Sequence, residues 1–337
     1  MGGELKTANG GMTGVRPGVG SELAERAAGL LAGGEVRMFL GYGAGRTPLR
    51  VRPRHVLRPE AAGGLVWNEF CAPSLAKYLL EEQEEEGRVG VLVKACDLRA
   101  VKRLVADRRV ERERVLLVGV GCPGVVDAGK VEAVLAQAVP GEMVEEAGVR
   151  DGVLVVQTRS GVREFPREEY LLERCLHCED PNPRDVDLFV GPEVAPWPAR
   201  PHDYAEVAEV AALGAAERAE YWDRQFARCL RCFACRSVCP ACSCRECCFD
   251  VWEPMWLPRE VSVPEQYMFH FTRAFHVAGR CVDCGECERV CPVGVPLMQL
   301  NRALQKEIAE LFGVERPWEP QEKEPLAMYT PDDPDFH

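Results

Sequence analysis

Two groups of four cysteines near the C-terminus share one spacing. Each group reads C-x2-C-x2-C-x3-C and is followed directly by a proline; the members are Cys229, Cys232, Cys235 and Cys239, and Cys281, Cys284, Cys287 and Cys291. Thiolates are the usual ligands of iron–sulfur clusters, and this run holds a pair of [4Fe–4S] clusters in bacterial two-cluster proteins. The sequence therefore predicts two such clusters and the chemistry they carry, which is electron transfer.

The fourth cysteine of such a run binds the cluster of the other run. The predicted ligands of the first cluster are Cys229, Cys232, Cys235 and Cys291, and those of the second are Cys281, Cys284, Cys287 and Cys239. A zinc site is a weaker interpretation, because structural zinc uses two separated ligand pairs and gains nothing from a third closely spaced cysteine. A disulfide framework is weaker still, since residues 1–20 lack the apolar stretch of a signal peptide.

A further set of cysteines predicts a third [4Fe–4S] cluster. Cys96 and Cys122 each lie just beyond a predicted buried strand, and Cys175 and Cys178 follow a short predicted helix. A right-handed crossover makes the two strands parallel, so their thiols emerge at the same sheet edge, where α/β proteins bind ligands. The alternative is that Cys96 and Cys122 are ordinary buried cysteines.

Four more cysteines, Cys242, Cys244, Cys247 and Cys248, directly follow the first run. Adjacent cysteines cannot easily face one metal centre, so at most Cys242, Cys244 and Cys247 are expected to be ligands. They could form a fourth cluster with an outside ligand, or replace the two strand-end cysteines of the third set. Cys71 stands alone and is expected in the core.

Lys94 is the candidate for cofactor binding outside the cysteines. It lies beside Cys96 at the predicted sheet edge, where its charge could face an anionic cofactor or tune a cluster; the alternative is a solvated strand end. The glycines of residues 41–45 do not form G-x-G-x-x-G before a helix, so a turn is favoured over a phosphate loop. No catalytic residue is predicted.

Bulk composition narrows the function further. The formal charge of −12 argues against nucleic-acid binding, which requires a concentrated basic surface. No apolar run approaches the roughly 20 residues that span a bilayer, so no membrane span is expected. Seventeen cysteines in a chain of 337 residues indicate metal ligation, in what we expect to be a reducing, anaerobic cytoplasm.

The elements that must position these cysteines predict an α/β protein: an N-terminal domain with a parallel or mixed sheet, followed by a mostly helical two-cluster ferredoxin-like domain. The expected divisions are a disordered stretch at 1–20, the α/β domain at 21–190, the dicluster domain with its preceding helices at 191–312, and an extended tail at 313–337.

Within this plan the predicted strands are Val36–Gly43, Val89–Val93 and Val115–Val120, with a hairpin of Val153–Val156 and Val162–Phe165 at the sheet edge. The predicted helices are Ser74–Glu86, Asp97–Ala106 with Asp97 as N-cap, Gly129–Ala138, Tyr204–Leu213, Ala215–Ala227, Pro264–Ala278 and Pro296–Phe312. A Pro- and Gly-rich stretch, Asp180–Pro201, is interpreted as the linker between the domains.

Three stretches of the sequence resemble known families. Lys94–Ala100 (KACDLRA) and Gly119–Asp127 (GVGCPGVVD) resemble the N-terminal half of the deazaflavin-dependent hydrogenase/dehydrogenase β-subunit family. Phe226–Pro240 (FARCLRCFACRSVCP) resembles the dicluster ferredoxin module, which also occurs in iron–sulfur subunits of anaerobic sulfite reductase and soluble hydrogenases.

The resemblance implies an electron-transfer subunit that relays electrons between other subunits of a redox complex of the formate dehydrogenase, hydrogenase or heterodisulfide reductase type. The catalytic centre would then lie in a partner subunit. Some members of the family bind FAD and reduce a deazaflavin. The alternative function is therefore a flavin-containing reductase subunit that passes electrons from the clusters to a soluble hydride carrier.

Overall fold

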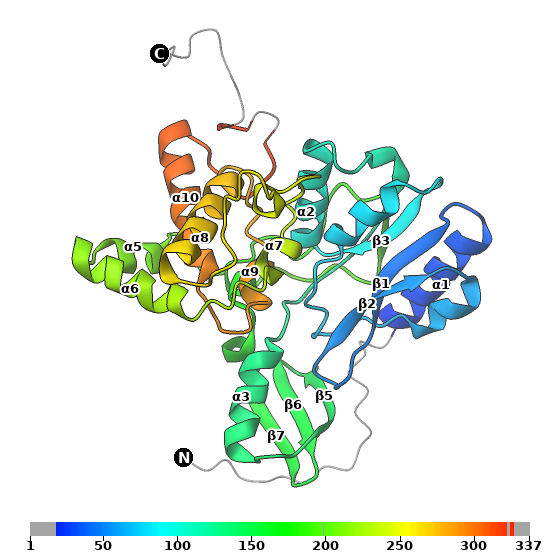
Figure 1. Ribbon diagram of the computed structural model, residues 1–337. Helices are drawn as coiled ribbons and strands as arrows, with labels where there is room; N and C mark the ends of the chain where they lie inside the picture. The colour runs from blue at the N-terminus through cyan, green and yellow to red at the C-terminus, as the bar shows by residue number, and fades with distance from the viewer. Residues whose placement is uncertain (1–17, 198, 322–323, 327–337) are drawn as a thin grey trace. The chain divides into compact units, whose positions relative to one another are not determined.

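The computed structural model describes residues 18–197, 199–321 and 324–326 (Figure 1). Residues 1–17, most of the stretch predicted to be disordered, lie outside the described residues, as does the end of the predicted tail from 327. The chain forms two compact units. The first contains the residues up to Leu98 together with Glu111–Pro201, and the second contains Arg99–Val110 and the chain from His202 onward.

The first unit is built on a mixed five-stranded sheet with the order β2-β1-β3-β4-β8. All neighbours are parallel except β2, which runs antiparallel to β1. The strands are β1 (Met38–Ala44), β2 (Val51–Val56), β3 (Val89–Val93), β4 (Val115–Val120) and β8 (Leu188–Val190). Every residue of β3 and β4 is buried, as expected for parallel strands covered on both faces. The predicted bounds of these two strands are confirmed.

Short β8 corrects the predicted linker, because residues within Asp180–Pro201 pair with β4 instead of leaving the sheet. Two glycines of the GVGCPG stretch permit this approach. A Cβ on Gly119 would lie 2.9 Å from Cγ2 of Val186, and one on Gly121 would lie 2.9 Å from the Pro192 carbonyl oxygen. These glycines therefore serve packing against the returning chain.

A second, antiparallel sheet belongs to the same unit, with the order β5-β6-β7. Its strands are β5 (Val144–Arg150), β6 (Val153–Thr158) and β7 (Gly161–Pro166). The hairpin of β6 and β7 was predicted, but it does not extend the parallel sheet. Instead its apolar face packs with Val131 and Leu135 of α3 (Ala128–Ala138) in a separate core (Figure 1).

The remaining elements of the first unit are mostly short. They are α1 (Val19–Ala32), α4 (Glu173–Leu176) and the 3-10 helices η1 (Pro59–Gly64), η2 (Ala76–Gln83), η3 (Arg112–Arg114) and η4 (Arg167–Tyr170). The helix predicted at Ser74–Glu86 is thus a shorter 3-10 helix. Helix α2 (Ala95–Ala106) begins in the first unit and continues into the second.

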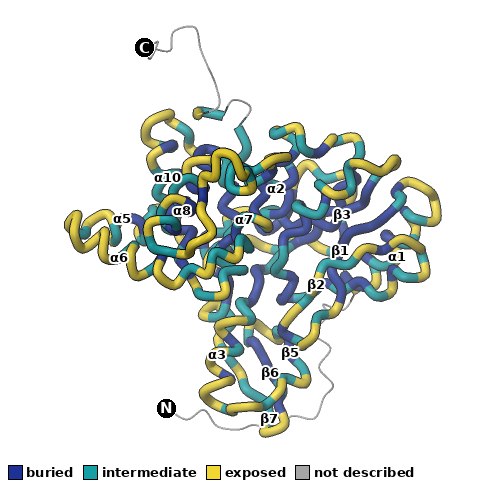
Figure 2. The backbone as a smooth tube through the Cα atoms, in the orientation of Figure 1, coloured by how far each residue is buried: buried dark blue, intermediate teal, exposed yellow. Residues whose placement is uncertain are grey.

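The described part of the second unit consists of helices and loops. Its helices are α5 (Ala205–Ala211), α6 (Ala215–Ala227), α7 (Ala234–Ser237), η5 (Cys248–Asp250), α8 (Val263–Val277), α9 (Glu286–Arg289) and α10 (Leu297–Phe312). Its core joins Phe226, Phe269 and Leu297 to two cysteines of the predicted cluster runs, Cys235 and Cys287. Figure 2 shows buried segments where α8 and α10 meet this core, and mostly exposed residues along α6.

Candidate metal centres

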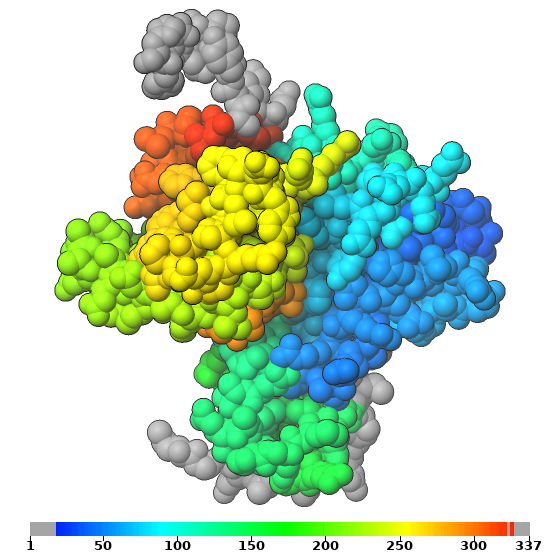
Figure 3. Space-filling view, viewed as in Figure 1, coloured from blue at the N-terminus to red at the C-terminus, as the bar shows by residue number. Residues whose placement is uncertain are grey.

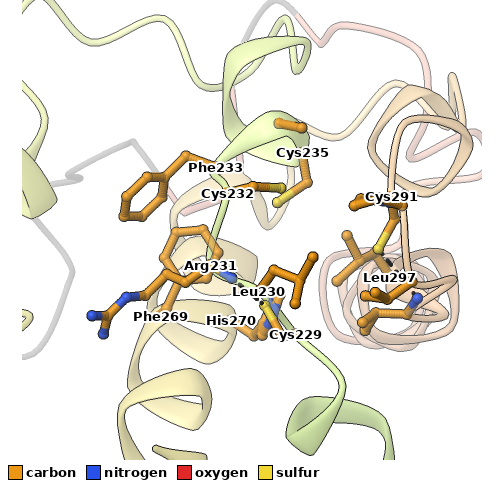
Figure 4. A pocket seen from close by; sticks show the side chains of 14 residues that line it. Cys229, Leu230, Arg231, Cys232, Phe233, Cys235, Phe269, His270, Cys291 and Leu297 are labelled. Carbon is orange, nitrogen blue, oxygen red and sulfur yellow. Dashed lines mark hydrogen bonds between the residues drawn. The ribbon is translucent and has the colours of Figure 1, made fainter. Parts of the chain in front are cut away.

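The first predicted ligand set surrounds one cavity. Cys229, Cys232 and Cys235 line it from the first run, and Cys291 lines it from the second run (Figure 4). The rest of the lining is largely apolar, and includes Leu230, Phe233, Ala234, Phe269, Val293, Val295 and Leu297. Three closely spaced thiols and one from the other run therefore meet around a small apolar space.

The second predicted ligand set surrounds another cavity in the same unit. Cys281, Cys284 and Cys287 line it together with Cys239, the last cysteine of the first run. In both cavities the thiols enclose a space and do not meet at a point. Among the described residues, no group of three or more His, Cys, Asp or Glu side chains is arranged to hold a single metal ion.

The two runs share one unusual backbone. The third and fifth positions of each run have positive φ: 48° at Arg231 and 59° at Phe233, and 50° at Asp283 and 63° at Gly285. A short helix then begins, α7 in one run and α9 in the other. A left-handed backbone is uncommon outside glycine, and for Phe233 it is strained. The left-handed positions thus recur in both loops that bring three thiols to one cavity.

Backbone amides donate to several of these sulfurs. The Arg231 N–H lies 3.3 Å from Cys229 Sγ, and the Val295 N–H lies 3.3 Å from Cys291 Sγ. Burial raises the pKa of Cys235 to about 11 and that of Cys287 to about 12. Without a metal, the thiols of Cys235 and Cys287 therefore stay protonated near neutral pH, and a metal that binds these two must displace their protons.

The third predicted set is partly assembled in the first unit. Cys122 packs with Cys175, and the N–H of Val125 donates to Cys175 Sγ at 3.3 Å. Burial raises the pKa of Cys122, and the nearby thiols of Cys175 and Cys96 add to the shift. Cys178 follows the short helix α4, with its Sγ 3.5 Å from the Asp180 carbonyl oxygen.

Lys94 lies in the interior of the first unit, and not at an open sheet edge. Its side chain is 1% exposed, forms an ion pair with Asp97 at 2.7 Å and donates to the hydroxyl of Tyr42. Asp97 also accepts from the Lys94 backbone N–H. Asp97 lies within the first turn of α2, and not at its N-cap as predicted. The charge of Lys94 interacts with the thiols of Cys96 and Cys122, so this buried cation acts on the third cysteine set.

The glycines of residues 41–45 are also explained by packing. Gly41 and Gly43 lie within β1, where a Cβ on Gly41 would meet Leu65 at 2.6 Å and one on Gly43 would meet Arg54 at 3.0 Å. Most of this stretch is therefore strand, where the sequence favoured a turn.

The cysteines after the first run differ in their surroundings, although Cys248 lies near both Cys247 and Cys244. Cys242 packs against the small core formed by Cys239, Ala241 and Val277, whereas Cys247 interacts with the charge of Arg236. Cys244 is exposed, in a part of the chain that reaches the surface facing the viewer in Figure 3 (yellow). Cys71 is buried in the first unit, as predicted.

Sequence reasoning missed a group of polar residues beside the first cavity. Gln266, His270 and Arg273 lie on α8 and are buried. The sequence did contain a signal for this group: the three polar residues are four and three positions apart in a predicted helix rich in aromatic residues, which places them on one face of it.

The comparison with family models matches residues 86–199 to the C terminus of the coenzyme F420 hydrogenase/dehydrogenase beta subunit. This match supports the resemblance to the deazaflavin-dependent β-subunit family. The matched model describes the C-terminal region of those proteins, where the sequence motifs suggested the N-terminal half. The matched residues include Lys94 and the third cysteine set, and they end before the paired runs.

Two relatives from methanogens carry related names. The F420-dependent formate dehydrogenase subunit beta of Methanocaldococcus jannaschii is 24% identical over 312 residues, which cover 75% of this chain and 79% of that protein. The F420-dependent formate dehydrogenase 1 subunit beta of Methanococcus maripaludis is 24% identical over 131 residues, which cover 36% of this chain and 34% of that one.

Among solved structures, the chain is similar to one in the F420-reducing [NiFe] hydrogenase complex from Methanosarcina barkeri. The sequence identity is 18% and the TM-score is 0.37, over 47% of this chain and 58% of that chain. Across the described residues, every helix of our chain is too short or too polar to cross a membrane.

The buried ion pair of Lys94 and Asp97 gives a test of the first unit. Replacing Lys94 by Met leaves the Asp97 charge buried without its cation, which typically costs about 3–5 kcal/mol. We expect a loss of that size in the opening free energy of β1 and β3 amides, measured by hydrogen exchange. Adding Asp97→Asn should recover part of the loss.

The matched control is Arg50→Gln, which breaks the more exposed pair of Arg50 with Glu132. Its effect should stay within about 1 kcal/mol. If Lys94→Met lowers the opening free energy of the β1 and β3 amides no more than this control does, the buried ion pair does not stabilise these strands.

Proposed function

We propose that this chain is an iron–sulfur electron-transfer subunit of a multi-subunit oxidoreductase. The observation that carries the proposal is the pair of cavities, each lined by three thiols of one run and one of the other. That is the ligand exchange typical of paired [4Fe–4S] clusters. The relatives named as β subunits of formate dehydrogenase support a role within a complex.

The residues around the cavities suit such clusters. Eight thiols would supply the donors, and apolar side chains such as Phe269, Val295 and Leu297 would limit the access of water to a cluster in the first cavity. Amide N–H groups directed at Cys229 and Cys291 would stabilise the negative charge of ligand sulfurs. When bound, each cluster would accept and release one electron. The second unit, with the chain up to about residue 312, would then be the dicluster domain.

The first unit would add a third cluster on Cys96, Cys122, Cys175 and Cys178. The proximity of Cys175 and Cys96 to Cys122 supports this assignment, and Lys94 would offset part of the charge of these thiolates. We propose that the protein works in the cytoplasm of an anaerobic cell, and that formate, hydrogen or heterodisulfide chemistry takes place in a partner subunit.

The family match favours a second candidate, a flavin-containing subunit that reduces a soluble hydride carrier. The two functions differ in one measurement. Protein isolated without oxygen and denatured by acid should release no FAD if the chain is a relay alone. Release of about one FAD per chain would instead support the reductase.

The exchange of the fourth cysteine can be tested by combining variants. Cys232→Ala and Cys291→Ala are each expected to remove about four iron atoms, and the double variant should lose no more, because both residues hold one cluster. Cys291→Ala with Cys239→Ala should lose about eight. Iron analysis after anaerobic isolation gives the counts.

Cys248→Ala is the matched control, since this cysteine lines neither cavity and its variant should keep the full iron content. If Cys291→Ala and Cys232→Ala remove different clusters, so that their losses add, the exchange is absent.

A further inference from the structure

Helix α8 presents three polar side chains on one buried face. Gln266, His270 and Arg273 are only 1%, 2% and 3% exposed, and their spacing places them on the same side of the helix. Burying polar groups is costly unless they find partners. Aromatic residues fill much of the rest of this part of the core, so these three residues need a specific explanation.

His270 contacts a proposed cluster ligand directly. Its Nε2 lies 3.3 Å from Cys229 Sγ (Figure 4). The ring stacks on Phe226 with centroids 4.7 Å apart and meets Phe269 edge-on, which fixes its orientation. Since a metal-bound thiolate can only accept, Nε2 must carry the proton and donate to the sulfur.

Arg273 lies close to thiols of both cavities. Its Nη2 is 3.4 Å from the Cys235 carbonyl oxygen. Its charge interacts most strongly with Cys239 and Cys287, and further with Cys242 and Cys235. One buried cation therefore acts on ligands of the first and of the second proposed cluster.

Helix α10 lies against the second cysteine run as α8 lies against the first, so the contacts of the two helices can be compared. Gln266 donates to the Cys229 carbonyl oxygen at 3.1 Å, and Gln305 of α10 donates to the equivalent carbonyl of Cys281 at 3.0 Å. This glutamine contact is the same at both runs. At the sulfurs the two sites differ: the imidazole of His270 lies 3.3 Å from a ligand of the first, whereas the amide of Asn301 lies 3.6 Å from Cys287 of the second.

We propose that side chains of α8 make the reduction potentials of the two clusters different. His270 raises the potential of the first cluster alone, and Arg273 raises the potentials of both. The inference rests on the proposed function. Reduction adds negative charge to a cluster, so a hydrogen-bond donor or a cation beside its sulfurs favours the reduced form. His270 and Arg273 are positioning and tuning residues, and they are not ligands.

The test is His270→Phe, which keeps a ring between Phe226 and Phe269 but removes the N–H donor. It is made in two backgrounds: Cys284→Ala, which retains the first cluster, and Cys232→Ala, which retains the second. We expect the reduction potential of the first cluster to fall by about 59 mV, which is a tenfold smaller equilibrium constant for one-electron reduction. Potentiometric titration followed by EPR measures this potential. The potential of the second cluster should not shift. His270→Gln keeps an N–H donor, so it should lower the potential of the first cluster less than His270→Phe does.

Two further variants of α8 serve as controls. His276→Gln removes an exposed histidine of the same helix and should leave both potentials unchanged, whereas Arg273→Gln should lower both. If a background loses both clusters, the same variants are titrated with all cysteines present, where two reduction steps are followed.

An unchanged first potential in His270→Phe at full iron content would overturn the inference, and so would equal shifts of both clusters. Neither result touches the proposed function, which instead fails if the unmodified chain binds no clusters.

Discussion

Neither cysteine run can complete a four-thiol site alone, because each cavity takes its fourth thiol from the other run. The two loops must therefore pack against each other before either site exists, and α7 and α9 lie in contact as a result. Helices α8 and α10 hold the loops through matching glutamine contacts with Cys229 and Cys281. Binding of the proposed clusters would therefore be coupled to folding of this unit, since cluster ligation would join segments that lie far apart in sequence.

The sites could be predicted from the sequence where covalent spacing alone constrains them. Three cysteines at C-x2-C-x2-C can reach one cluster whatever surrounds them, so both quartets followed from residue types and intervals. Strands β3 and β4 were equally visible as continuous apolar runs. Contacts between distant segments were not visible where no motif marks them. β8 is three residues long and only its last residue is buried, and it pairs with β4 only because Gly119 leaves room.

Buried polar residues were the main failure of sequence reasoning. Lys94 was expected at the sheet edge beside Cys96, either facing a cofactor or cluster or as a solvated strand end, and the structure shows it buried against Asp97 and Tyr42. Nothing in the local sequence reveals a tyrosine so far away along the chain. The contacts of His270 with Cys229 and of Arg273 with Cys235 likewise form only because α8 packs against the cysteine loops. In both units the polar groups lie beside thiols, where they would balance the negative charge that thiolate ligands of the proposed clusters bring into an apolar interior.

The metal content of the unmodified chain decides most directly whether the two cavities hold clusters. Mössbauer spectroscopy of protein isolated without oxygen from cells grown on 57Fe measures the form of all bound iron at once. We expect essentially all of it in [4Fe–4S] clusters, with at least two clusters in each chain and reversible one-electron reduction. Iron present only as single ions, or cysteines occupied by zinc, would contradict the account.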